Sequence, residues 1–166
     1  MTSYPPNMQI DSSRVPNAAF DSTPLPIKIP ALSIDAPIVG VPYKDNTWDI
    51  SWLWDQAGWL QGTAYPTFFG NSIITGHLVT ADGKPGTFYK KNLEPGMYIL
   101  VDNDSFQYIY RVASKRFVGP SDESILDHQE KPWLTLITCD SYDARTRTYL
   151  RRLVVEAELV NVLPVQ

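Results

Sequence analysis

The chain has 166 residues, of which 43% are hydrophobic and 12% aromatic; this length and composition are typical of one compact globular domain. The formal net charge is −4 at pH 7 and no run of Lys and Arg occurs, so a nucleic-acid-binding protein is not expected. The single cysteine, Cys139, excludes an intramolecular disulfide and metal sites built from several cysteines.

The N-terminal part of the chain has the composition of a linker. Residues 1–26 scatter prolines among Ser, Asn, Asp and Thr without an apolar period, which predicts a flexible tether, with the folded domain covering residues 27–166. The first residues lack the basic and apolar regions of a signal peptide, and no apolar stretch is long enough to span a bilayer. A cytosolic protein and an extracellular protein without its anchor both remain open at this point.

Short apolar segments broken by turn residues follow in the first half of the domain. Ile27–Pro30 and Leu32–Val39 predict two short strands, and Asn71–His77 predicts a strand that ends in a glycine and a histidine. A helical turn is expected at 51–55, among four tryptophans that we interpret as packed core aromatics rather than a sugar-binding platform. These are Trp48, Trp52, Trp54 and Trp59.

The second half contains the clearest alternation. Phe106, Tyr108, Tyr110 and Val112 alternate with other residues at a period of two, the pattern of a half-buried strand. Further strands are expected at Met97–Val101, Trp133–Cys139 and Tyr149–Val160, helical turns at Thr87–Asn92 and, capped by Ser121, within Ser121–Gln129, and a polar loop at Asp140–Thr148. The prediction is an all-β fold: a mostly antiparallel, closed barrel of about eight strands with one or two short helices.

One constellation of residues carries chemistry. Cys139 and His77 each end a predicted strand, and Arg151 and Arg152 begin the strand after the cysteine loop. If that strand pairs antiparallel with the cysteine strand, one arginine lies beside Cys139. A thiolate, an imidazole and a guanidinium together suit acyl transfer, as nucleophile, general acid and oxyanion donor.

The local motifs then resemble one family. Thr135-Leu136-Ile137-Thr138-Cys139 matches the Thr-Leu-x-Thr-Cys signature of sortases, and the segment from Asn71 to His77 resembles the one leading to their catalytic histidine. The segment Arg152–Ala157 is similar to the strand that carries their arginine, and Ile29-Pro30 and Ile34–Ile38 are similar to their first strands. The resemblance covers residues 27–160.

The resemblance implies an extracellular, membrane-anchored cysteine transpeptidase built on an eight-stranded β-barrel. Such enzymes cut a Leu-Pro-x-Thr-Gly-type sorting signal between Thr and Gly through a thioester, and transfer the surface protein to an amine of a cell-wall precursor or a pilin lysine. Carried over, Cys139 is the nucleophile, His77 the general acid and base, and Arg152 the carbonyl clamp, because Arg151 shares its face with Leu153 and Val155. Arg151 is the alternative.

Further expectations follow from the same resemblance. Thr138 and Leu136 are expected to bind substrate, and neither a cofactor nor a metal is required. Asp122, Glu123 and Asp127 lie where some sortases bind a stimulatory calcium ion, although a solvated acidic loop is favoured, and His128 is interpreted as a surface residue. Anchoring of surface proteins is favoured over pilus assembly. Two alternatives remain: a plain cysteine hydrolase, and a barrel-shaped binding module in which Cys139 is a core residue.

Overall fold

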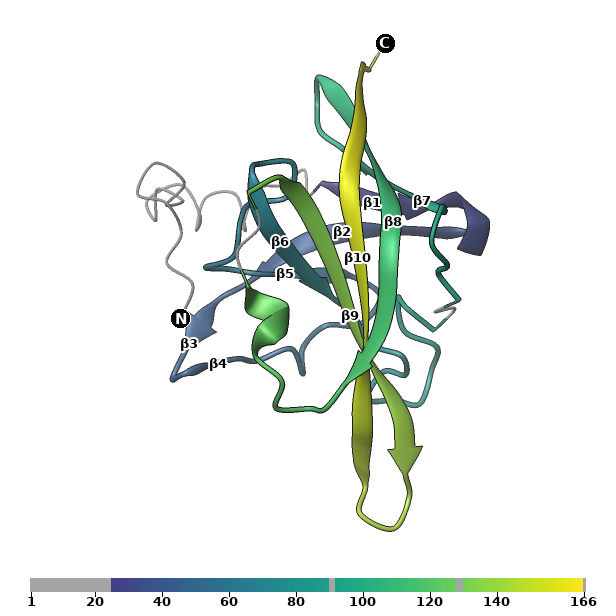
Figure 1. Cartoon of the computed structure of the whole chain (residues 1–166). Helices are drawn as coiled ribbons and strands as arrows, with labels where there is room; N and C mark the ends of the chain where they lie inside the picture. Colours follow the sequence, from purple (N-terminus) through teal and green to yellow (C-terminus); the bar gives the residue numbers. More distant parts are fainter. Residues whose placement is uncertain (1–24, 90–91, 128–129, 166) are drawn as a thin grey trace.

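The structure, a computed structural model, describes residues 25–89, 92–127 and 130–165 (Figure 1). The tether predicted for residues 1–26 and the surface position predicted for His128 therefore lie almost wholly outside the described residues. Eight strands close into a barrel: β1 (Pro26–Ile29), β2 (Ile34–Val41), β5 (Ala57–Leu60), β6 (Gly70–Thr75), β7 (Tyr98–Asp102), β8 (Phe106–Val118), β9 (Pro132–Asp143) and β10 (Thr148–Pro164). Within the described part of the chain, no helix is long and apolar enough to cross a membrane.

The strand order around the barrel is β1-β2-β5-β6-β9-β10-β8-β7, and β7 pairs back with β1 to close it. Most neighbours are antiparallel, but β2 pairs with β5 and β6 with β9 in parallel. A separate ribbon of β3 (Tyr43–Lys44) and β4 (Thr47–Trp48) is joined by Asp45 and Asn46, both with positive φ, as a two-residue hairpin turn requires. The predicted fold class, an all-β closed barrel of eight strands, is confirmed.

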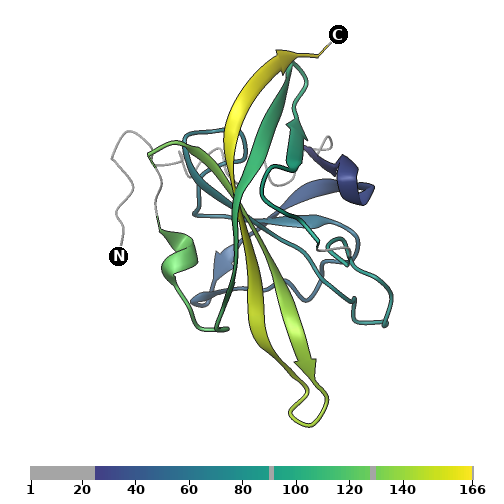
Figure 2. The ribbon, with the colours of Figure 1, turned by 45° about the vertical axis from the view of Figure 1, so that its right-hand side comes forward.

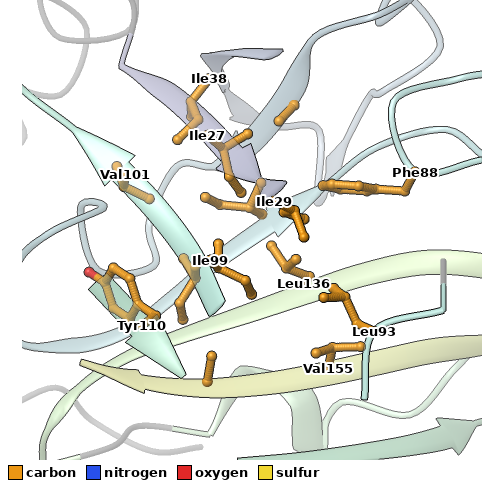
Figure 3. Close-up of a cluster of buried hydrophobic side chains, with 14 of the residues drawn as sticks. Ile27, Ile29, Ile38, Phe88, Leu93, Ile99, Val101, Tyr110, Leu136 and Val155 are labelled. Carbon is orange, nitrogen blue, oxygen red and sulfur yellow. The ribbon is translucent and has the colours of Figure 1, made fainter. Parts of the chain in front are cut away.

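The barrel interior is one apolar cluster to which all eight strands contribute residues, because alternate residues of each strand point inward. It includes Ile27 and Ile29 of β1, Tyr110 of β8, and Leu136 of β9, and Figure 3 shows these side chains converging from different strands. Trp59 is also fully buried there, so the core interpretation holds for this tryptophan. Trp52 and Trp54, by contrast, are exposed.

A second apolar cluster covers the outside of one wall of the barrel. It joins the outward residues of six strands to Leu53 and Ile125, which belong to two loops lying over that wall. Both faces of β5 and β6 are therefore buried. The members are Val41, Leu53, Leu60, Ile73, Val118, Ile125, Ile137 and Val154.

The structure corrects several predicted boundaries. Strand β5 was not predicted, and the segment 51–55 is a turn rather than a helix. Two 3₁₀ turns, η2 (Pro30–Leu32) and η3 (Ser124–Leu126), are the helical elements of the described chain, and η3 is preceded by Glu123 rather than capped by Ser121. The polar loop expected at Asp140–Thr148 is shorter, because β9 and β10 continue as a ribbon that projects beyond the barrel in both views (Figures 1 and 2).

Candidate functional site: a cysteine, an arginine and a histidine on the outer wall

Cys139 lies within β9, not at its end, and its thiol is half-buried and forms no disulfide. Two residues earlier, Ile137 packs in the outer cluster. Because side chains of a strand alternate between faces, Cys139 lies on the same outer face as Ile137. The predicted strand end at Cys139 is therefore wrong, although the parallel pairing of β9 with β6 stops two residues earlier, at Ile137 and Thr75.

Arg152 is the residue directly opposite Cys139 in the antiparallel ladder of β9 and β10. Its neighbour two positions on, Val154, belongs to the outer cluster, so Arg152 faces the same side as Cys139. Arg151 faces the other way, and its guanidinium carbon lies 3.6 Å from the centre of the Phe117 ring. The predicted antiparallel pairing is thus confirmed, and it brings Arg152 rather than Arg151 to the cysteine.

His77 reaches the same region from β6. The strand ends at Thr75, the last residue paired with β9, where Thr75 lies opposite Ile137. His77 follows Thr75 by two residues and Cys139 follows Ile137 by two residues. Because the two segments run in parallel, both residues lie two positions beyond the last β6–β9 pair, at the same end of that pairing. The Thr138 hydroxyl donates to the Gly76 carbonyl (3.3 Å), which extends the contact between the two segments by one more residue.

The backbone around His77 is held by close packing against the loop that follows it. The Phe88 N–H donates to the His77 carbonyl (3.1 Å). A Cβ on Gly86 would lie 2.1 Å from the His77 carbonyl oxygen, and one on Gly76 would lie 2.7 Å from the Phe88 ring. Glycine is therefore required at both positions for this approach. Gly86 was not predicted to contribute.

The imidazole has a backbone partner as well. Its Nε2 lies 2.8 Å from the carbonyl oxygen of Ile50, in the loop between β4 and β5. The ring is half-buried. His77 is therefore tied both to β6 and to one of the two loops that cover the outer wall.

Cys139 and Arg152 line a groove of about 430 Å³ on this wall. Its floor includes Leu60, Thr75 and Ile137. One side comes from Asn46, Trp48 and Ile50, and the other from Pro120–Glu123, Ile125 and Leu126. Cys139 and Arg152 thus share a hollow that combines apolar residues with a few polar groups, as ligand-binding sites commonly do.

The second side of the groove is anchored by a buried amide. The Asn71 side-chain nitrogen donates to the carbonyls of Ile125 and Asp127 (3.0 Å each), and Thr135 donates to the Asn71 side-chain oxygen (2.6 Å). Asn71 is 2% exposed, so these bonds are shielded from water and hold the loop against β6 and β9. Sequence reasoning placed Asn71 in the histidine strand but did not assign it this role.

The two residues predicted to bind substrate differ in position. Thr138 lines the groove, although its hydroxyl is engaged by Gly76. Leu136 points into the barrel interior and is 4% exposed (Figure 3). The position of Leu136 does not fit the substrate-binding prediction, because alternation along β9 places it on the face opposite Ile137 and Cys139.

Burial raises the pKa of the Cys139 thiol above its ordinary value, and the positive charge of Arg152 offsets part of that rise. The arginine is therefore an electrostatic as well as a geometric partner of the sulfur. Among the described residues, no group of three or more His, Cys, Asp or Glu side chains could hold a metal ion. The Asp122 carboxylate instead accepts the Ser124 N–H (2.8 Å), and the Ser124 bonds hold the pKa of Asp122 below its ordinary value.

Comparison with known proteins decides the family. The family model of the Sortase domain matches residues 27–160, most of the chain. The chain belongs to the sortase family. A Bacillus subtilis (strain 168) protein named "Putative sortase YwpE" is 35% identical over 71 residues, which are 43% of this chain and 66% of that protein.

Solved sortases share the fold. Sortase A from Corynebacterium diphtheriae, in a lid mutant, superposes with a TM-score of 0.71 at 26% identity, covering 89% of this chain and 75% of that one. Sortase C-3 from Streptococcus pneumoniae gives a TM-score of 0.68 at 25% identity, covering 87% of this chain but 65% of that one. This chain thus spans about two thirds of the length of YwpE and of Sortase C-3.

Proposed function

We propose that this sortase is a cysteine transpeptidase that cleaves a Leu-Pro-x-Thr-Gly-type sorting signal between Thr and Gly and joins the new carboxyl end to an amine. The observation that carries the proposal is the direct pairing of Cys139 with Arg152, both of which line one groove on the outer wall. The position of His77, two residues beyond the last β6–β9 pair, supports it. The proposed nucleophile and oxyanion donor come from the adjacent strands β9 and β10, and the proposed acid comes from the segment that directly follows β6.

In the first half of the reaction, the Cys139 thiolate attacks the carbonyl carbon of the signal's threonine and a C–S bond forms. The Arg152 guanidinium donates hydrogen bonds to the carbonyl oxygen as it becomes negative. Imidazolium at His77 gives its proton to the glycine nitrogen, the C–N bond breaks, and the glycine peptide leaves with a free amine. The product is a thioester on Cys139.

In the second half, an acceptor amine attacks the thioester carbonyl and His77 takes the proton that the amine loses. A new amide bond forms, the C–S bond breaks, and the Cys139 thiolate is regenerated. Water in place of the amine would give a free acid. Burial of the thiol favours its neutral form at neutral pH, so only a fraction of the free protein holds the reactive thiolate.

The groove suits an extended, largely uncharged peptide. Leu60, Ile125 and Ile137 offer apolar surface against which Leu and Pro side chains can be buried, at about 25 cal/mol for each Å² removed from water. The Asn71 amide holds the loop of Ile125 in place without a ligand. Acyl transfer by a thiol, an imidazole and a guanidinium requires no cofactor or metal, so the proposal includes neither these nor a calcium ion.

The biological partners proposed are surface proteins that bear a sorting signal, and a cell-wall precursor or pilin lysine that supplies the amine. The proposed site of action is the extracellular face of the cell membrane, to which the protein is anchored. Anchoring of surface proteins is favoured over pilus assembly. These proposals rest on the family, whereas the reaction rests on the groove lined by Cys139 and Arg152 and on the position of His77.

The test is incubation of the protein with a fluorogenic Leu-Pro-x-Thr-Gly peptide and with a Leu-Ala-x-Thr-Gly counterpart, each with and without oligoglycine, followed by mass spectrometry. Cleavage between Thr and Gly with an oligoglycine-ligated product, absent in Cys139→Ala, is the expected result. Cleavage to the free acid alone, even with amine in excess, would favour a hydrolase. No cleavage, with a thiol inert to alkylation in the folded protein, would leave a binding module.

A further inference from the structure

The contact between His77 and Ile50 specifies where the imidazole carries its hydrogen. A backbone carbonyl oxygen has only lone pairs, so the Nε2 atom 2.8 Å away must be the donor. We infer that the Ile50 carbonyl fixes neutral His77 as the Nε2–H tautomer, and so makes Nδ1 the nitrogen that exchanges protons in the reaction. The assignment of Nδ1 to proton transfer rests on the proposed function, whereas the tautomer does not.

The carbonyl is a built feature of the loop. The Leu53 N–H donates to the same Ile50 oxygen (3.1 Å), so this loop turns tightly over the acceptor. The Asp49 carboxylate accepts from the Ser51 N–H (3.0 Å) and hydroxyl (2.6 Å), which fixes the residues on either side of Ile50. The oxygen is therefore held in place from within its own turn.

The turn that contains Ile50 is also anchored on the barrel. Leu53 is 1% exposed and belongs to the outer cluster, and Ile50 packs against that cluster. A Cβ on Gly58 of β5 would lie 2.7 Å from the Leu53 side chain, so the leucine sits directly on the strand. With the His77 backbone gripped by Gly86 and Phe88, both ends of the hydrogen bond are fixed to the same wall.

In many catalytic triads a third group binds the histidine and holds its orientation, and the Ile50 carbonyl occupies that position here. A proton that moves between His77 and the thiol or the departing amine cannot use Nε2 while the carbonyl binds it. Nε2 carries hydrogen in both the neutral and the charged ring, so the bond to Ile50 persists through the cycle and keeps the ring from turning. Ile50 is thus a positioning residue, and it acts through its backbone.

The first test is ¹⁵N NMR of the imidazole in the intact chain carrying His128→Gln, which leaves His77 as the one histidine. In the neutral ring we expect one protonated and one unprotonated nitrogen at limiting shifts, and an Nε2–H proton that exchanges slowly with water and shows a cross-peak to Ile50. Free imidazole averages between its tautomers. Averaged shifts, or hydrogen on Nδ1, would overturn the inference.

The second test weakens the acceptor. Replacing the Ile50–Ser51 peptide bond by an ester leaves every side chain unchanged but makes the carbonyl a poorer acceptor. It also removes the Ser51 N–H that Asp49 accepts, so Asp49→Ala is the matched control. Relative to that control, kcat of the ester protein is expected to fall roughly tenfold with KM unchanged, together with loss of the slowly exchanging Nε2–H signal. Equal kcat in both proteins would contradict the role of the carbonyl.

The two proposals fail separately. If the protein has a fixed Nε2–H tautomer but cleaves no peptide, the tautomer assignment is supported and the transpeptidase proposal is contradicted. Peptide cleavage with averaged tautomers would preserve the transpeptidase and defeat the tautomer assignment.

Discussion

Arg152 and Cys139 are direct partners in the ladder of β9 and β10, and they face the same side of the sheet as the outer cluster. The arginine is therefore placed by backbone pairing rather than by a flexible side chain crossing a gap. Because the ladder fixes which residue lies opposite the sulfur, the neighbouring Arg151 cannot take the same position without a register shift that would turn over every side chain of β10.

Replacement of Arg152 should test this pairing directly. Arg152→Ala is expected to lower kcat/KM for the sorting peptide about 100-fold or more, the usual effect of losing an oxyanion donor. Arg152→Lys keeps the charge but not the forked donors and should recover only part of the activity. Arg151→Ala is the matched control, because this side chain packs on Phe117 on the other face. Comparable losses in Arg151→Ala and Arg152→Ala would contradict the assignment.

The reactivity of the thiol should depend on pH with a definite sign. Burial raises the pKa of Cys139, and Arg152 opposes that rise. The thiolate fraction, and with it the alkylation rate, should therefore increase roughly tenfold per pH unit until the raised pKa is reached. In Arg152→Ala the opposing charge is gone, so the whole profile should move to higher pH, whereas Arg152→Lys should stay near the wild type. The rate of iodoacetamide labelling at several pH values, followed by mass spectrometry, measures this.

Gly86 should be as necessary to the site as a residue that touches substrate. A methyl group in Gly86→Ala would collide with the His77 backbone, and relief requires His77 to move. Overpacking of this kind costs about 1–3 kcal/mol, a fall in Tm of roughly 5 °C for a domain of this size, and we expect a larger loss of activity. Gly119→Ala is the control, since its added Cβ meets no atom within 4 Å. Unchanged activity in Gly86→Ala would show that the His77 backbone is not held as described.

Asn71 should control binding of the peptide rather than the chemistry. Asn71→Ala frees the carbonyls of Ile125 and Asp127 and releases the loop that forms one side of the groove. If binding loses the net free energy of about one hydrogen bond, KM should rise about tenfold, with a smaller change in kcat. Thr135→Val removes only the bond to the Asn71 oxygen and should lower Tm with little change in KM. Steady-state kinetics and thermal unfolding distinguish the two variants.

The features predictable from sequence are those that leave a side-chain pattern. The alternation in β8 and the motif around Cys139 were sufficient for the barrel and for the pairing of the cysteine with an arginine. Strand β5 was missed because all four of its residues are buried, and a strand covered on both faces shows no alternation. The β9–β10 extension was read as a loop because polar residues dominate a ribbon that projects from the barrel.

Other features leave no such pattern. The acceptor for His77 is a backbone carbonyl. Every residue has this group whatever its side chain, so Ile50 could not be singled out from the sequence. Gly86 looked like ordinary turn chemistry because its close neighbour, His77, is set by the folded loop. Leu136 was assigned to substrate because it belongs to the cysteine motif, whereas the alternation of β9 places it in the barrel interior.

The parallel pairing of β6 and β9 ties the appearance of activity to the completion of folding. Thr75 and Ile137 are 62 residues apart in sequence, as their side chain-to-backbone bond records, and β7, β8 and their turns lie between them. A parallel neighbour cannot be reached through a tight hairpin, so its contact closes a long loop, and contacts of this kind slow folding. Chains that have formed only their local hairpins therefore present Cys139 without His77. A partly folded copy would carry a thiol but no acid to complete the proposed cleavage, and could not cleave neighbouring proteins.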